Sequence, residues 1–290
     1  MEHREQPLII ILADISGYTK FMVENHLSAV HGQMIITHLI ESLLNEVDIP
    51  LELQEIEGDA VFLFATRPED DAEWDEVLQQ VQTKLVRFFD VFIEAMVGIG
   101  EMTACECAIC THADELKLKV IAHSGQAVFH SIGNLRQVSG KDVILAHRLL
   151  KNSVPSDEYL LLSDAAYEEF GRSMGLEFQE QQESYESFGT VKTHVHFLGP
   201  QIDRARDEFY ELEPEGEKAA IRTYMRAGTL GTFKAGLQQL VRPDSDTGIV
   251  RRILFVLVMP FHAIYMAFRY PAAVAKKLEM QRALRASNEQ

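Results

Sequence analysis

The chain is poor in cysteine, and its three cysteines all fall between positions 105 and 110. This spacing is not typical of a disulfide framework, so we expect reduced thiols and a cytoplasmic protein. No charged region and cleavage site precede the first strand-like run, so we expect no secretory signal. Repeats and low-complexity runs are also lacking. With 290 residues, 47% of them hydrophobic and 24% charged, the composition predicts a globular protein of one or two domains.

Positive charge is scarce in the first three quarters of the chain. The formal net charge is −17, but residues 218–290 hold 12 Lys and Arg against 4 Asp and Glu, which leaves 15 basic and 40 acidic residues elsewhere. So acidic a region would repel phosphates, which argues against binding of nucleic acid. The asymmetry favours a basic segment with its own partner, attached to an acidic domain.

Two apolar runs each lead to an aspartate. In LIIILADISGYTKF, from Leu8 to Phe21, Asp14 follows the end of a predicted buried strand, and in LQEIEGDAVFLF, from Leu53 to Phe64, Asp59 lies in a hairpin-like corner. If the strands are neighbours, both carboxylates stand at one edge of a sheet, where they suit a hard divalent cation such as Mg²⁺. The alternative is that Asp14 only caps the next helix and Asp59 only makes the turn.

The periodicity of the chain predicts an α+β fold whose core has the order βαββαβ, with helices on one face of an antiparallel sheet. A helical C-terminal tail follows the core. The expected core elements are a strand ending at Asp14, one or two helices over 18–47, a hairpin over 51–65, a helix over 70–96 and strands over 103–109 and 116–129. Beyond the core we expect a helix over 142–152, a strand over 159–162, a helix over 164–171 and a strand or hairpin over 185–198.

The two aspartate motifs, in this order and about 45 residues apart, resemble the metal-binding motifs of class III adenylate and guanylate cyclases. The later stretches His123-Ser124-Gly125 and Gly140 to Arg148 resemble further motifs of that family. The resemblance covers about residues 7–200 and implies a ferredoxin-like fold and a head-to-tail homodimer. The Cys-x-Cys-x-x-Cys cluster and the run from His147 to Asn152 suggest an uncharacterised bacterial branch of that superfamily.

The resemblance also implies site residues. Asp14 and Asp59 would hold Mg²⁺ or Mn²⁺ ions that bridge the phosphates of a nucleoside triphosphate, and Arg148 would stabilise the transition state. An alternative for Arg148 is a helix-surface arginine that pairs with nearby carboxylates. Ile144 falls where the family carries an asparagine that orients the ribose. The implied nucleotide-binding residues are Ile15, Ser16, Gly17 and Tyr18, whose backbone N–H groups could cradle phosphate, and Glu55 and Gln137 at the base-reading positions.

Two functions follow from this mixture of retained and missing residues. One is a degenerate cyclase domain that binds a nucleotide, a metal or a partner in a regulatory, membrane-associated role. The other is an active cyclase that converts a nucleoside triphosphate to a cyclic nucleotide and pyrophosphate with two metal ions. Ile144, which cannot hydrogen-bond through its side chain, favours the first, and the intact aspartates favour the second.

Cys105, Cys107, Cys110 and His112 form a second candidate site, since three thiolates and an imidazole suit a structural Zn²⁺. His123 or His130 could replace His112 as the fourth ligand. The alternative is a set of small cysteines buried in a β core.

Residues 215–290 differ in kind from the rest and predict a basic, partly hydrophobic helical tail. Residues 253–268 carry no formal charge, are flanked by arginines and contain Pro260. A helix of this length is shorter than the roughly 30 Å hydrocarbon core, which argues against a spanning segment. We expect peripheral contact with the inner face of the membrane, with packing on the protein as the alternative.

Overall fold

A computed structural model describes residues 5–24, 29–102, 110, 112–133, 135–199, 204–205, 207–208, 211, 274–280 and 282. The chain divides into two compact units. The first comprises residues 1–96 and 112–201, and the second comprises residues 97–111 and 202–290. The predicted boundaries, 7–200 and 215–290, stay predictions.

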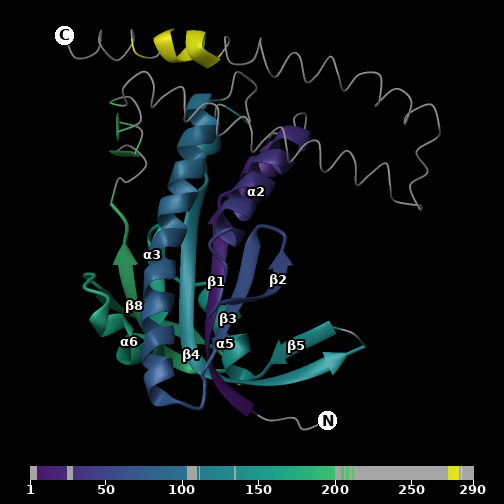
Figure 1. Cartoon of the computed structure of the whole chain (residues 1–290), viewed down its shortest axis with the longest axis vertical. Coiled ribbons are helices and arrows are strands. Elements are labelled where there is room, and N and C mark those ends of the chain that lie inside the picture. The colour runs from purple at the N-terminus through teal and green to yellow at the C-terminus, as the bar shows by residue number, and fades with distance from the viewer. Residues whose placement is uncertain are drawn as a thin grey trace. The chain divides into compact units, whose positions relative to one another are not determined.

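The first unit is built on one mixed sheet, shown in Figure 1. Among the described residues it has eight strands, in the order β2-β3-β1-β4-β6-β8-β7, and β5 pairs with β4 beside this path. All neighbours are antiparallel except β4 and β6. The elements are β1 (Glu5–Ser16), α1 (Tyr18–Glu24), α2 (Ala29–Leu44), β2 (Glu52–Glu57), β3 (Ala60–Thr66), α3 (Asp71–Met102), η2 (Ala113–Glu115), β4 (Lys117–Ile132), β5 (Leu135–Ser139), α5 (Lys141–Leu149), β6 (Tyr159–Ser163), α6 (Asp164–Glu169), η3 (Gly171–Ser173), β7 (Gln179–Tyr185) and β8 (Gly189–Phe197).

The central strand β1 is buried on both faces because helices cover both sides of the sheet. Successive side chains of a strand alternate between faces, so Leu8, Ile10 and Leu12 share the face that α5 covers. Ile9 and Ile11, both 0% exposed, point to the opposite face, which α2 and α3 cross in Figure 1. The α5 face holds one contiguous core, whose members include Phe62, Phe64, Ile121, Val143, Leu145, Ala146, Leu149, Leu161 and Val195.

Helix α5 is attached to β4 at its first turn. Asp142 Oδ2 accepts a hydrogen bond from the backbone N–H of Gln126 at 2.7 Å. Gly125 makes room for this carboxylate, because a Cβ at position 125 would lie 2.5 Å from Asp142 Oδ2. Gly140, just before α5, has φ 148° and lies against the backbone of Gln126. The glycines of the two motifs, Gly125 and Gly140, therefore have structural roles.

The predicted α+β fold class is confirmed, with the core order β1, α1 and α2, β2, β3, α3, β4. Two strands are absent from the prediction: β5, and β7, of which only the final residue, Tyr185, fell within the predicted segment. The predicted strand over 103–109 lies outside the described residues.

Little of the second unit is described. In it, Val274 and Leu278 are fully buried, and Lys277 Nζ donates to the backbone carbonyl of Gly100 at 2.6 Å. The segment 253–268 lies outside the described residues, so membrane contact stays a prediction. Within the part of the chain that is described, no helix combines the length and the apolar character needed to cross a bilayer.

Candidate functional site

Asp14 and Asp59 lie together at one end of the sheet. Asp14 is opposite Ala60 in the β1–β3 ladder, and Asp59 occupies the turn just before Ala60. The backbone N–H of Ile15 donates to the carbonyl of Asp59 at 3.2 Å, which ties the two segments together. Gly58 adopts φ 67° in this turn, a backbone conformation that glycine reaches without strain. The expected neighbouring placement of the two aspartates thus agrees with the register of the strands.

The two carboxylates interact unfavourably when both are ionised. Burial, followed by the negative charge of Asp14, raises the pKa of Asp59 from 3.8 to about 6. The positive charge of Lys119 acts in the opposite direction but is the smallest of the causes. A cation placed between the carboxylates would relieve this repulsion.

Lys119 is the residue of this site that sequence reasoning missed. It lies opposite Asp14 in the β1–β4 ladder, and its Nζ is 2.8 Å from Asp14 Oδ2. Both side chains are mostly buried, with 20% of Lys119 and 18% of Asp14 exposed. Alternation along β4 could have placed Lys119 on this face, but its pairing with Asp14 requires the register between two strands that are about 100 residues apart in sequence.

Tyr159 forms the next position of the same row, beside Lys119 on β6. It is 3% exposed, and its hydroxyl makes hydrogen bonds with Asn152 at 2.7 and 3.1 Å. Asn152 in turn donates to the carbonyl of Leu149 at 2.7 Å, so the end of α5 is fixed to β6 at this row. Burial raises the pKa of Tyr159, so its side chain is a neutral neighbour of the ion pair between Lys119 and Asp14.

Arg148 lies in the last turn of α5. Its side chain is exposed and makes no ion pair with any described residue, so the alternative of a surface salt bridge finds no support in the described part of the chain. The neighbouring His147 packs edge-on against Phe62 with ring centroids 5.2 Å apart, which places this turn over β3. One turn earlier, the apolar side chain of Ile144 is 54% exposed.

The predicted base-reading residues lie on β2 and β5. Glu55 is exposed on the edge strand β2, opposite Phe62. Gln137 lies on β5 opposite His130, eleven residues along β4 from Lys119, which is roughly 35 Å in an extended strand. Figure 1 shows this β4–β5 ribbon projecting beside the main sheet. One chain alone therefore cannot bring Gln137 to the aspartate pair.

Ile15 and Ser16 end β1, Gly17 follows, and Tyr18 begins α1. Ile15 and Ser16 are buried, whereas Gly17 is exposed and Tyr18 is half-buried. Gly17 adopts φ 87° and its carbonyl accepts the N–H of Phe21 at 2.9 Å, which begins the helix. Because the N–H of Ile15 already donates to Asp59, it is not available to a phosphate in this structure.

The zinc hypothesis stays a prediction. Cys110 is half-buried and His112 is exposed, while Cys105 and Cys107 lie outside the described residues. His123, the alternative ligand, is 5% exposed, and its Nδ1 lies 2.7 Å from Ser163 Oγ. Within the described residues, no three His, Cys, Asp or Glu side chains gather as ligands of one metal ion.

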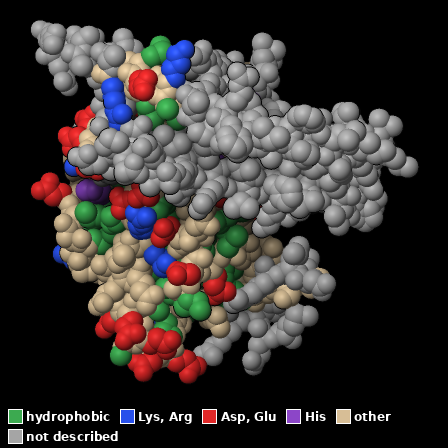
Figure 2. Space-filling model, turned by 45° about the horizontal axis from the view of Figure 1, so that its top comes forward, with side chains coloured by type: hydrophobic (Ala, Val, Ile, Leu, Met, Phe, Trp, Pro, Cys, Tyr) green, Lys and Arg blue, Asp and Glu red, His purple; other side chains and the backbone are tan. Residues whose placement is uncertain are grey.

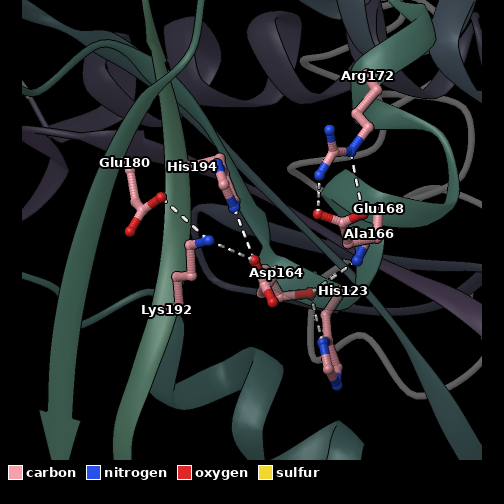
Figure 3. A network of polar contacts seen from close by, with 9 residues as sticks. His123, Asp164, Ala166, Glu168, Arg172, Glu180, Lys192 and His194 are labelled. Carbon is pink, nitrogen blue, oxygen red and sulfur yellow. Dashed lines mark hydrogen bonds and ion pairs between the residues drawn. The ribbon is translucent and has the colours of Figure 1, made fainter.

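A separate polar network fixes α6 to the sheet, as Figure 3 shows. Ser163 Oγ accepts the N–H of Ala166 at 3.2 Å and so caps α6, while it also contacts His123. Asp164 Oδ1 accepts from His194 Nε2 at 2.8 Å and pairs with Lys192 Nζ at 3.5 Å. The hydrogen bond from His194 lowers the pKa of Asp164. These contacts position the end of β6.

The surface in view in Figure 2 carries acidic side chains at several places, as the composition of the first unit predicts. An open groove of about 560 Å³ lies between α3 and the loop before β2. Charged and polar side chains line it, among them Lys84, which donates to the backbone carbonyl of Glu46, and Arg87, which pairs with the Glu46 carboxylate. It lacks the apolar enclosure of a small-molecule pocket.

Three comparisons place this chain among known proteins. Residues 36–159, less than half of the chain, match a family described as a protein of unknown function (DUF2652). The uncharacterized protein Rv2561/Rv2562 of Mycobacterium tuberculosis is 27% identical over 159 residues, which cover 55% of this chain and 71% of that protein.

Solved structures share the fold. The adenylyl cyclase CyaB from P. aeruginosa superposes with a TM-score of 0.53 at 15% identity, over 69% of this chain and 98% of that one. The guanylyl cyclase Cya2 gives a TM-score of 0.52 at 14% identity, over 69% and 96%. At such identities the likeness shows the fold alone, which is that of adenylyl and guanylyl cyclase catalytic domains.

Proposed function

We propose that residues 7–200 form a divergent nucleotidyl cyclase-like domain that binds a nucleotide, a divalent cation or both in a regulatory role. The observation that carries this proposal is a site that has the two aspartates but lacks a polar residue to orient a ribose. Asp14 and Asp59 stand together at one end of the sheet, but Ile144 offers only an apolar, exposed side chain where the cyclases orient a ribose. Such a site can hold a cation and phosphates without positioning a sugar for reaction.

The donor set fits Mg²⁺ or Mn²⁺. Asp14 and Asp59 supply hard carboxylate oxygens, and a divalent ion would offset the repulsion that raises the pKa of Asp59. When bound, such an ion supplies concentrated positive charge that neutralises phosphate oxygens and a pyrophosphate leaving group. The chain itself contributes the backbone hydrogen bond from Ile15 to Asp59, which holds the two segments that carry the carboxylates next to each other.

A homodimer belongs to this proposal. Gln137 lies roughly 35 Å along β4 from the row of Asp14, so a nucleotide on the aspartates could reach Gln137 only in a second copy of the chain. The solved cyclases share this fold, and a head-to-tail pair would bring the β4–β5 ribbon of one copy to the aspartates of the other. The exposed guanidinium of Arg148 would then also face the shared site.

Arg148 supports a second candidate, an active cyclase. Its guanidinium makes no ion pair with any described residue, so it can meet the charge that develops on a phosphoryl group. In this reading a nucleoside triphosphate becomes a cyclic nucleotide and pyrophosphate, and the substrate is placed by contacts other than Ile144.

One experiment separates the two candidates. The purified full chain is incubated with Mn²⁺ and each of ATP, GTP, CTP and UTP, and products are identified by mass spectrometry while nucleotide binding is followed by calorimetry. Asp14→Ala removes one carboxylate, and Asp90→Ala, an exposed aspartate on α3, is the matched control. Binding without product, lost in Asp14→Ala and kept in Asp90→Ala, supports the regulatory domain.

A cyclic nucleotide made by the wild type and by Asp90→Ala, but not by Asp14→Ala, would establish the active cyclase instead. A folded, dimeric protein that binds neither Mn²⁺ nor any of the four nucleotides would refute both candidates.

A further inference from the structure

Lys119 places its ammonium group beside Asp14. The side chain comes from the middle of the sheet, its Nζ lies 2.8 Å from Asp14 Oδ2, and both groups are about four-fifths buried. A charge-assisted bond of this length between poorly hydrated groups is among the stronger polar contacts in a protein. Asp14 is therefore already neutralised before any ion arrives.

Among the described residues, Asp14 is the ion-pair partner of Lys119. On the opposite side from Asp14 lies Tyr159, whose hydroxyl is committed to Asn152 at 2.7 and 3.1 Å. The positive charge of Lys119 lowers the pKa of Asp59, but by less than the negative charge of Asp14 raises it. The ammonium is thus held by Asp14 and has no second carboxylate at ion-pair distance among the described residues.

We propose that Lys119 is a built-in counter-ion of Asp14, and that a divalent cation must displace its ammonium from Asp14 in order to bind. This inference rests on the proposed cation site. An ammonium and a divalent ion cannot share Asp14 Oδ2 closely, because two positive charges about 3–4 Å apart repel each other strongly in a partly buried site. The ion pair therefore sets the threshold of cation concentration at which the site fills.

The displacement has a chemical consequence. Once it leaves Asp14, the ammonium is a buried positive charge next to a bound ion, and it needs an anion or access to water. Lys119 consequently weakens the binding of a cation that arrives without an anion.

The test measures Mn²⁺ alone, without nucleotide, binding to the full chain at pH 7.5 by calorimetry. Lys119→Gln removes the competing charge at similar length, and Lys119→Arg keeps it. We expect Lys119→Gln to bind Mn²⁺ about tenfold more tightly than the wild type or better, since a hydrogen bond to a charged group is worth roughly that factor. The affinity of Lys119→Arg for Mn²⁺ should stay within about threefold of that of the wild type, because arginine keeps the competing positive charge.

The outcomes separate this inference from the site itself. If Lys119→Gln binds Mn²⁺ no more tightly than the wild type, or more weakly, Lys119 is not a competitor and the inference is wrong, while the cation site stands. If the wild type and both variants fail to bind Mn²⁺ while remaining folded, the cation site itself is refuted.

A measurement on the wild type covers the case in which Lys119→Gln does not fold. The ammonium signal of Lys119, assigned with Lys119→Arg, is followed by NMR in lysine-labelled protein during addition of Mg²⁺. We expect the signal to move from that of a paired ammonium towards that of a free lysine as Mg²⁺ saturates the site. A signal that does not move on saturation would overturn the displacement.

Discussion

Replacing Asp59 by Asn should stabilise the metal-free protein at neutral and alkaline pH. The pKa of Asp59 is raised from 3.8 to about 6, so the folded state holds this proton more tightly than the unfolded chain does. The stability that the proton confers is fully present below pH 3.8 and is lost as the pH rises through 6. Asparagine resembles the neutral carboxyl group, and its contribution does not depend on pH.

The size of the effect follows from the shift. Roughly two pKa units at about 1.36 kcal/mol each give a ceiling of about 3 kcal/mol. Asp59 is only half-buried, so solvent screening reduces the expected gain to about 1–2 kcal/mol at pH 8. The gain should vanish near pH 4, where Asp59 of the wild type is protonated in the folded state.

Urea unfolding in the presence of EDTA measures this directly. Trp74, the single tryptophan, is 4% exposed in the same unit as Asp59 and reports on its unfolding. Asp90→Asn on α3 is the control, for which we expect no gain at either pH. A variant Asp59→Asn that is less stable than the wild type at pH 8, or a gain that is equal at pH 4 and pH 8, would refute the argument.

Two further predictions concern Gly125 and His123, which lie close together on β4. Gly125→Ala should lower the free energy of unfolding by about 2–4 kcal/mol, because the new Cβ would lie 2.5 Å from Asp142 Oδ2 and would break the bond to Gln126; Gly100→Ala, with open space around its Cβ, is the control in the same urea assay. Burial lowers the pKa of His123 below 6.5, so the protein should lose stability as the pH falls from 6.5 through the pKa that His123 has in the folded state. The variant His123→Asn should not show this loss when urea midpoints are measured between pH 7.5 and 5. An unchanged acid slope in His123→Asn would show that other groups carry the loss.

The sequence was sufficient where one physical signal dominated. The run from Leu8 to Ala13 is apolar at every position, which predicts a strand buried on both faces, and β1 is such a strand. The apolar spacing of Trp74, Val81, Leu85 and Phe88 predicts one face of a helix, and these four residues are buried on α3.

Strands without such a signal were not predicted. Strand β7, with the sequence QEQQESY, lies at the edge of the sheet, and most of its side chains are exposed or half-buried. Its one buried acid, Glu183, accepts hydrogen bonds from the N–H and the hydroxyl of Ser153 at 3.0 and 2.8 Å. Because tertiary contacts, rather than an alternating pattern, hold this strand, periodicity could not find it.

The candidate site divides in the same way. Asp14 and Asp59 could be predicted as a pair because each follows from a local signal, a strand end and a turn, and the hairpin brings its turn to the end of β1. Lys119 could not, because its meeting with Asp14 depends on the register of β1 against β4. That register also decides the charge of the site, because with Lys119 opposite Asp14 the two carboxylates have one positively charged side chain beside them. The aspartate motifs alone therefore say where an ion could bind, whereas the strand register decides what the ion must displace.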